Sequence, residues 1–586
     1  MVSYKALNTI IKVNIDTHKR RRLEYYDYLC GVNTVDSSYL MIQYNKYFPE
    51  YLILLILNTL TAVVYNVFNE SLALIPMRVG VAIINGAGFT LIMVLIIHLV
   101  RKYLKINLFI PVLLVEVVIF IIECFLLLNF YSLVTPSVLL VILETNPNET
   151  TEFFQTYFNY QIWFLYGLIA FLTYMGIRFR RRLACIHFPN IIAKNRRLLL
   201  LCLAVLLSYI GLVYYVTQIR HMTSYQMLTG VERVWHSART TLKNRAEKQK
   251  YMELVRKDLP LVSTQSSTYC KIPYVVIILD ESISKWHMNA YGYSVMTTPL
   301  LNERIHHEET TLFQNIQTPR TITAEALREI MTFHDDSDTI AWYQCHTLPA
   351  VMKAAGYYTC WISNQDSFTR DDENSTQSIA STSDTVLFTH QRHSSEERFG
   401  YFDEELLPLL DRVLDQKRDT YFICLHMMGA HLRYTNRYPS DFDRFDIAEE
   451  RPELNYNQKV TVAKYDNCIL YNDYVCNEII KRFEDKEAVV LCFTDHGEEV
   501  YDTRSMSGHS AFNPSEPMIK IPFWIWTSET FKSKRGDLDM RIRQSAQTPF
   551  NTSNLVHSVM DLCGLQCVEY DETKSLFYLN QLSSSR

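Results

Sequence analysis

The sequence predicts an N-terminal transmembrane domain of five helices, followed by a C-terminal α/β domain with a mostly parallel sheet flanked by helices. The first observation is a change in composition: apolar residues dominate from about 51 to 219, whereas the chain after 220 has the composition of a soluble α/β protein. The second is the alternation of strand-like and helix-like segments in the later part, which favours parallel strands covered by helices on both faces. The length of 586 residues also exceeds one ordinary domain.

Five stretches are long and apolar enough to cross a bilayer. They are 51–68, 76–100, 106–132, 161–177 and 198–219. Lys and Arg gather before the first stretch, between the second and third, and between the fourth and fifth, while 69–75 and 133–160 contain neither. The positive-inside rule therefore predicts a cytoplasmic N-terminus and an external C-terminal domain. Because the first stretch follows a long basic segment, we do not expect a cleaved signal peptide.

These features predict four parts. They are a cytoplasmic segment 1–50, a transmembrane domain 51–219, an amphipathic connector 220–265 and an external catalytic domain 266–586. Within the connector, 242–257 has helix-forming composition and many Lys and Arg. It suits an anionic membrane surface, and a plain solvated helix is an equal alternative. The net charge of −5 argues against nucleic acid as a partner.

Six strands are expected in the C-terminal domain, and helices fill much of the space between them, of which four are examples. The strands are 274–280, 311–316, 357–363, 420–426, 488–494 and 521–526; the helices are 323–333, 346–355, 402–415 and 461–484. In such a sheet, functional groups collect beyond the carboxyl ends of the strands.

Two strand ends carry candidate metal ligands. VVIILDES at 275–282 and VVLCFTDHGEE at 489–499 are apolar runs that end in acidic and histidine side chains. Buried parallel strands have this pattern when a ligand follows them. Glu281, Asp495 and His496 would supply carboxylate oxygens and an imidazole nitrogen, a set that suits zinc.

The nucleophile is expected in QTPRTITAEALREIMTF at 317–333. A hydroxyl is a poor nucleophile at neutral pH, and metal coordination activates it. Thr323 would open a helix, where free backbone amides favour a phosphoryl group, although an ordinary N-cap threonine has the same pattern. Thr321 and Ser282 are competing hydroxyls. Alternation at the strand end should turn Ser282 away from the preceding Glu281.

Three further histidines lie in loops of the expected active-site edge. His426 and His431 bound the string HMMGAH, and His509 lies in SMSGHSAFNP. Histidines there could bind a second metal, hold a phosphate or donate a proton to a leaving group. Of thirteen cysteines, Cys345 with Cys360 and Cys563 with Cys567 are candidate disulfides, which sequence alone cannot establish.

The C-terminal half resembles bacterial phosphoethanolamine transferases of the alkaline phosphatase and sulfatase superfamily, and most of all the type that modifies the heptose of the core oligosaccharide. The matching strings, in family order, are ILDES, YGYSVMTTP, TPRTITAEAL, AGYYTCWISNQ, HMMGAHLRYTNRYP, YDNCILYND, FTDHGEEVYDT and IPFWIWTSE. The resemblance implies an alkaline phosphatase-like fold, five membrane spans in the bacterial inner membrane and a periplasmic catalytic domain.

The resemblance also implies roles for residues. Glu281, Asp495 and His496 match zinc ligands, and Thr323 matches a nucleophile that also ligates zinc. His431 and His509 match catalytic or substrate-binding histidines near the phosphate or a second zinc. His426 matches the other histidine of that motif. ETNPNE at 144–149 is similar to the family motif for the lipid headgroup, which gives substrate-binding roles to Thr145 and Glu149.

Three departures from the family pattern stand out. Val141 replaces an expected asparagine, Asp280 replaces the usual glycine before the zinc-binding glutamate, and the nucleophile helix TAEALREIM lacks the cysteines of the lipid A branch. The implied reaction moves phosphoethanolamine from phosphatidylethanolamine through Thr323 to a lipopolysaccharide core, lipid A or periplasmic glucan acceptor. The alternatives are a glycerophosphate transferase, a phosphatase or sulfatase on the same fold, and a catalytically inactive scaffold.

Overall fold

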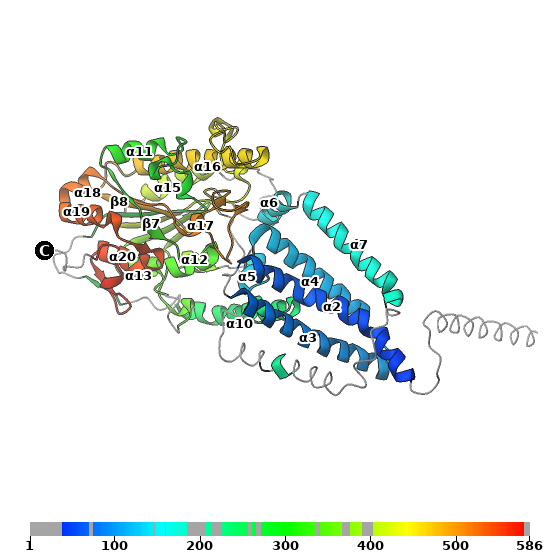
Figure 1. Cartoon of the computed structure of the whole chain (residues 1–586). Coiled ribbons are helices and arrows are strands. Elements are labelled where there is room, and N and C mark those ends of the chain that lie inside the picture. Colours follow the sequence, from blue (N-terminus) through cyan, green and yellow to red (C-terminus); the bar gives the residue numbers. More distant parts are fainter. Residues whose placement is uncertain are drawn as a thin grey trace, which may run out of the picture. The chain divides into compact units, whose positions relative to one another are not determined.

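The structure of the protein is a computed structural model (Figure 1). It describes residues 38–69, 74–144, 147–158, 160–183, 207–209, 211, 225–255, 261–264, 271–334, 340–365, 375–389, 402–511 and 513–578.

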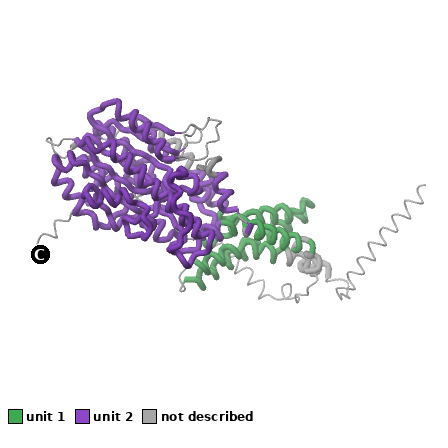
Figure 2. The backbone as a smooth tube through the Cα atoms, turned by 90° about the horizontal axis from the view of Figure 1, so that it is seen from above, with its two compact units in different colours: residues 1–125, 161–233 green, residues 126–160, 234–586 purple. Residues whose placement is uncertain are grey.

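The chain divides into two compact units (Figure 2). One unit comprises residues 1–125 and 161–233, and the other comprises 126–160 and 234–586. The domain boundaries expected from the sequence stay predictions. The structure nevertheless groups 126–160, which begins within the third apolar stretch, with the C-terminal part of the chain.

Within the described part of the chain, three helices are long and apolar enough to cross a membrane. The spans are Glu50–Phe68 in α2 (Ser38–Asn69), Ile75–Tyr103 as α3, and Phe109–Phe130 as α4, with mean hydropathies of 1.9, 2.3 and 2.8. The fourth predicted stretch lies in α7 (Tyr160–Leu183), where the apolar part, Ile162–Met175, is shorter. The fifth falls largely outside the described residues. Five spans are therefore not confirmed. The helix expected at 242–257 is the later part of a longer helix, α10 (Gly230–Val255).

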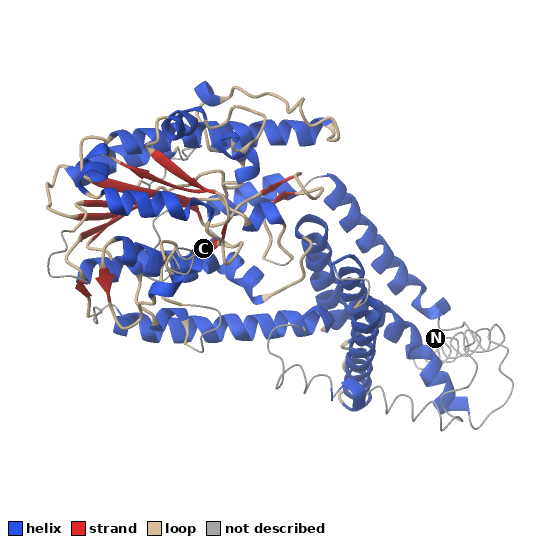
Figure 3. Cartoon of the chain, turned by 60° about the vertical axis from the view of Figure 1, so that its left-hand side comes forward, coloured by secondary structure: helices blue, strands red, loops and turns tan. Residues whose placement is uncertain are grey.

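The C-terminal domain is built on a seven-stranded sheet (Figure 3). Its spatial order is β3 (Thr310–Phe313), β11 (Phe523–Thr527), β8 (Ala488–Thr494), β2 (Tyr274–Asp280), β7 (Tyr421–His426), β5 (Tyr358–Ser363) and β6 (Thr385–Phe388). The last five are mutually parallel, whereas β11 runs antiparallel to both β3 and β8. The sheet is therefore mixed, although most strand pairs are parallel as expected.

The antiparallel strand has a simple cause. Phe523, which starts β11, pairs with Phe493 near the end of β8, so the loop between the two strands leaves and re-enters the sheet at one edge. A crossover helix would have carried the chain to the opposite edge and made β11 parallel. The whole loop, including His496 and His509, thus stays at the carboxyl edge of β8.

Helices cover both faces of the sheet (Figure 1). One face packs against α12 (Thr323–Ile330), α13 (Leu348–Ala354) and α20 (Leu555–Leu562), and the other against α11 (Pro299–His306), α15 (Leu406–Leu414) and α16 (Tyr456–Lys481). In β2, alternate residues enter the two cores, with Ile277 on the first side and Ile278 on the second. This explains why the central strand is apolar from Val275 to Leu279: neither face meets water.

The other α-helices and β-strands of the described chain are short. They are α5 (Pro136–Glu144), α6 (Pro147–Tyr157), α14 (Ser375–Ala380), α17 (Glu516–Ile519), α18 (Glu529–Lys534), α19 (Gly536–Gln544), β1 (Ser263–Thr264), β4 (Ile316–Gln317), β9 (Glu499–Val500), β10 (Ser507–Gly508), β12 (Phe550–Asn551) and β13 (Leu565–Gln566). Neither candidate disulfide forms: Cys345 is not bonded to Cys360, and Cys563 is not bonded to Cys567.

Candidate active site

The register of two central strands brings the proposed carboxylates together. Asp280, the last residue of β2, pairs with Thr494, the last residue of β8. The chain continues the pairing for one step, since the Asp495 amide donates to the Asp280 carbonyl at 3.1 Å. Glu281 and Asp495 therefore leave the sheet side by side at its carboxyl edge.

Glu281, Asp495 and His496 form one buried group, in which each side chain is at most 1 % exposed. The Nε2 atom of His496 lies 3.3 Å from Glu281 Oε1 and 3.4 Å from Asp495 Oδ2. Its other ring nitrogen, Nδ1, lies 3.0 Å from the Gly497 carbonyl oxygen and donates to it. That hydrogen bond orients the ring so that Nε2 faces the carboxylates, which is the usual support of a metal-binding histidine.

The electrostatics of this group suit a cation. Burial and repulsion from Glu281 raise the pKa of Asp495 to about 6. Burial opposes charge on His496, but Asp495 and Glu281 outweigh it and raise the His496 pKa to about 10. Burial also opposes ionisation of Glu281, yet the hydrogen bond and charge of His496 hold the Glu281 pKa below its ordinary value. Two buried carboxylates thus stabilise positive charge between them.

One atom shows that the group fits a metal ion. Asp495 Oδ2 is buried and accepts no hydrogen bond from any residue that the structure describes. A buried carboxylate oxygen that accepts no hydrogen bond is costly, and a coordinated cation would satisfy it. The set of two carboxylates and one imidazole is the donor chemistry that zinc takes in catalytic sites.

Thr323 faces the same group from α12. The helix forms because Ala326, Leu327 and Ile330 bury one face against the sheet, and it begins at Thr323 itself. The Thr323 hydroxyl lies 3.1 Å from each carboxylate oxygen of Glu281 and 3.4 Å from His496 Nε2. A hydroxyl at a helix N-terminus is thereby held against three potential metal-binding atoms.

The competing hydroxyls have other contacts. Thr321 Oγ1 donates to the Ser510 carbonyl at 2.7 Å and so shapes the turn before α12. Ser282 does not turn away from Glu281, and that expectation is wrong: Ser282 Oγ donates to Glu281 Oε1 at 3.0 Å. Strand alternation ends at Asp280, and Ser282 has a φ of 60°, so its side chain folds back. Among the three hydroxyls, the one on Thr323 contacts both Glu281 oxygens and His496.

Two loop histidines lie near this group. The rings of His496 and His509 have centroids 4.1 Å apart, and His509 Nδ1 lies 2.8 Å from Glu498 Oε2. Burial and the positive charge of His496 lower the pKa of His509 to about 3. Burial, Arg437 and His509 likewise lower the pKa of His431 to about 3. Both imidazoles are therefore neutral and can offer an N–H to an anionic oxygen.

The third histidine has different partners. His426 ends β7, and its Nδ1 and Nε2 atoms lie 3.2 Å from Ser363 Oγ and from Gln365 Nε2. These polar contacts bind it to β5 and the loop that follows. The headgroup motif cannot be located in the same detail, because Thr145 and the side chain of Glu149 lie outside the described residues.

Several supporting residues were missed by the sequence analysis. Glu498 is buried beside His509, and burial raises its pKa to about 8. Asp403 accepts hydrogen bonds from the backbone amides of Met428 and Gly429, at 2.7 and 2.9 Å, and so fixes the loop before His431. Glu498 stands in the string FTDHGEEVYDT, which marks it as a candidate, whereas no local signal marks Asp403.

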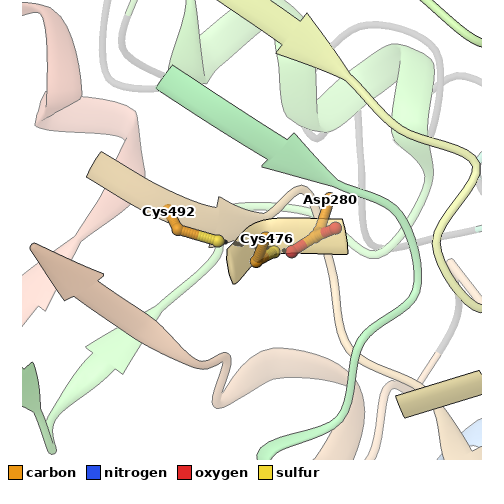
Figure 4. A group of neighbouring side chains, drawn as sticks. All are labelled: Asp280, Cys476 and Cys492. Carbon is orange, nitrogen blue, oxygen red and sulfur yellow. Dashed lines mark hydrogen bonds between the residues drawn. The ribbon is translucent and has the colours of Figure 1, made fainter. Parts of the chain in front are cut away.

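The unusual Asp280 has partners of its own beneath the site (Figure 4). Asn472 on α16 donates to Asp280 Oδ1 at 2.6 Å, and Cys492 on β8 donates to Oδ2 at 3.4 Å. Cys476 also lies on α16. Asp280, Cys476 and Cys492 form a buried group in which the carboxylate oxygen and the two sulfur atoms lie within 4.8 Å of one another. Because both carboxylate oxygens are hydrogen-bonded, the cluster ties α16 to β2 and β8.

Known proteins share this architecture. The family model described as Sulfatase matches residues 273–565, half of the chain. The chain belongs to the sulfatase family. Phosphoethanolamine transferase EptC of Escherichia coli O18:K1:H7 is 29 % identical over 467 residues, covering 75 % of this chain and 77 % of the relative. Phosphoethanolamine transferase CptA of Salmonella typhimurium is 29 % identical over 460 residues, covering 75 % of this chain and 77 % of the relative.

Solved structures agree with this assignment. The periplasmic domain of Escherichia coli EptC in complex with Zn has 30 % identity and a TM-score of 0.50, covering 54 % of this chain and 89 % of that one. The integral membrane lipooligosaccharide phosphoethanolamine transferase A of Neisseria meningitidis has a TM-score of 0.58, covering 90 % of this chain and 96 % of that one. At 18 % identity, the second similarity concerns the fold alone. The expected resemblance is confirmed.

Proposed function

We propose that this protein is a zinc-dependent inner-membrane transferase that moves phosphoethanolamine from phosphatidylethanolamine to a cell-envelope glycolipid or glycan. The single observation that carries the proposal is the position of Thr323, whose hydroxyl lies 3.1 Å from both oxygens of Glu281. The relatives named as phosphoethanolamine transferases support the transferred group, and the three apolar helices support a membrane location.

The first step makes a covalent enzyme. The Thr323 oxygen forms a bond to the phosphorus of the donor, and the bond from phosphorus to the diacylglycerol oxygen breaks. The leaving oxygen takes up a proton in place of the one that Thr323 loses, so diacylglycerol departs as an alcohol. In the second step, an acceptor oxygen forms a bond to the same phosphorus, and the bond from phosphorus to the Thr323 oxygen breaks. The Thr323 oxygen takes up a proton, from the acceptor hydroxyl or from water, and phosphoethanolamine leaves on the acceptor.

The residues around Thr323 have separate roles in this scheme. Glu281, Asp495 and His496 would hold zinc, which when bound lowers the pKa of a hydroxyl and neutralises phosphoryl charge. His431 and His509 would donate hydrogen bonds to phosphoryl oxygens, a role that the low pKa of each neutral ring permits. Thr145, Glu149 and His426 are the further candidates for donor binding.

The acceptor is a lipopolysaccharide core, a lipid A phosphate or a periplasmic glucan. A relative in Salmonella typhimurium is named a Kdo(2)-lipid A phosphoethanolamine 7''-transferase, with 23 % identity over 306 residues. Mass spectrometry of envelope glycolipids and glucans, from cells with and without the gene, would identify which class gains phosphoethanolamine.

The test of the donor uses the full-length protein in lipid vesicles. Vesicles that contain phosphatidylethanolamine should release diacylglycerol in the presence of acceptor, and Thr323→Ala should abolish the release. Release from phosphatidylglycerol vesicles alone would indicate a glycerophosphate transferase instead. Release of free phosphoethanolamine to water, with no transfer to any envelope acceptor, would indicate a hydrolase.

A further inference from the structure

Helix α6 contacts both loops that carry the site histidines. It spans Pro147–Tyr157 and belongs to the same compact unit as the catalytic domain. Two of its side chains, Glu152 and Tyr157, make the contacts, and each contact reaches a different loop.

The first contact runs through Arg437, which is 1 % exposed. Glu152 accepts hydrogen bonds from Asn436 Nδ2, at 2.8 Å, and from the Arg437 guanidinium, with which it also forms an ion pair. The same guanidinium donates to the backbone carbonyl of His431 at 3.1 Å and to that of Leu432 at 2.9 Å. Arg437 therefore connects the α6 carboxylate to the backbone that carries the His431 ring.

The second contact reaches the loop of His509. Tyr157 is buried, and its hydroxyl lies 3.4 Å from the carbonyl oxygen of Ser507. The ring packs against Phe130 and Phe153, with centroids 4.8 and 5.1 Å away, and this fixes its position. Gly508 has a φ of 123°, and a Cβ there would lie 2.6 Å from the Tyr157 hydroxyl. The backbone immediately before His509 thus packs directly on α6.

We propose that α6 positions His431 and His509, with Glu152 acting through Arg437 and Tyr157 acting through Ser507 and Gly508. Neither α6 residue has to touch the substrate, so both are positioning residues. The inference rests on the proposed function, because it assigns these contacts a purpose in that reaction. It also links α6 to donor binding: the string 144–149, which is proposed to bind the donor, continues into the helix that positions the histidines.

The kinetic test uses the full-length enzyme in phosphatidylethanolamine vesicles. Glu152→Gln should lower kcat about tenfold and leave KM within about twofold, since a displaced group slows the reaction more than it weakens binding. Glu152→Asp should recover part of the rate. Gln155→Ala, on an exposed position of the same helix, is the matched control and should retain the wild-type rate.

A double-mutant cycle tests the route through Arg437. Arg437→Lys should lower kcat by a similar factor. The kcat of the Glu152→Gln/Arg437→Lys double variant should be no lower than that of the less active single variant. If the loss of kcat in the double variant equalled the product of the two single losses, the two residues would act independently. A loss confined to KM would make Glu152 a lipid-binding residue. Either result would overturn the proposal.

Hydrogen exchange separates this proposal from the proposed function, because it needs no activity. Glu152→Gln should speed amide exchange in 427–437, and Tyr157→Phe should do so in 505–511, while Gln155→Ala changes neither segment. Unchanged exchange in the first two variants would refute the contacts. If exchange changes as expected in an enzyme that releases no diacylglycerol, the positioning contact stands and the proposed reaction fails.

Discussion

Replacing Gly429 with alanine should disable the site by displacing Glu281. Gly429 has a φ of 50°, and a Cβ there would lie 2.4 Å from the carbonyl oxygen and 2.9 Å from the amide nitrogen of Glu281. Both are backbone atoms, so the clash cannot be relieved by a side-chain rotation. Restoring an ordinary contact near 3.4 Å requires Glu281 or the loop to move by about 1 Å, and a misplacement of about 1 Å can cost roughly 100-fold in rate.

The stability cost has two parts. The left-handed conformation costs a non-glycine residue about 1–2 kcal/mol, and forced overpacking adds about 1–3 kcal/mol. Gly292→Ala is the control, because its φ is 101° but nothing lies within 4 Å of the new Cβ. We expect Gly429→Ala to unfold at a lower temperature than Gly292→Ala and to release diacylglycerol about 100-fold more slowly than wild type. Equal stability and activity in the two variants would refute the role of close packing at Glu281.

Three other predictions follow from the same region. Glu498→Gln, which weakens the support of His509, should lower transfer about tenfold while the metal content stays unchanged; loss of the metal would instead make Glu498 a ligand. Burial lowers the pKa of His287, but Asp466 and Asp502 outweigh it and raise that pKa to about 9. The stabilisation that protonated His287 gives the folded protein, on the order of 3 kcal/mol, should be complete below pH 6.5 and disappear as the pH rises through 9. Thermal unfolding between pH 6 and 10 should show this loss in wild type and not in His287→Gln. Dialysis against a chelator should lower the unfolding temperature and stop diacylglycerol release, and added zinc should restore both; undiminished release from metal-free enzyme would contradict the metal assignment.

The central strands could be predicted because the local sequence alone marks where each one begins and ends. The run 274–280 matches β2, since a strand buried on both faces is apolar throughout and ends abruptly at its polar residues. The same logic placed Glu281, Asp495 and His496 together, because side chains that follow the carboxyl ends of parallel strands collect at one edge of the sheet.

Other features depend on contacts that no local pattern records. Strand β6 was missed because its four residues, Thr385–Phe388, follow a polar stretch and are only partly buried at the edge of the sheet. The direction of β11 depends on where the preceding loop returns. The orientation of Ser282 depends on a positive φ, and the importance of Asp403 depends on amides 25 and 26 residues away.

The central claim is that Thr323 carries phosphoethanolamine, and peptide mapping after incubation with phosphatidylethanolamine and no acceptor tests it most directly. The account predicts one phosphoethanolamine on the peptide that contains Thr323, located at that residue by fragmentation and absent from Thr323→Ala. An adduct on Ser282 or Thr321, or an undiminished adduct in Thr323→Ala, would contradict it.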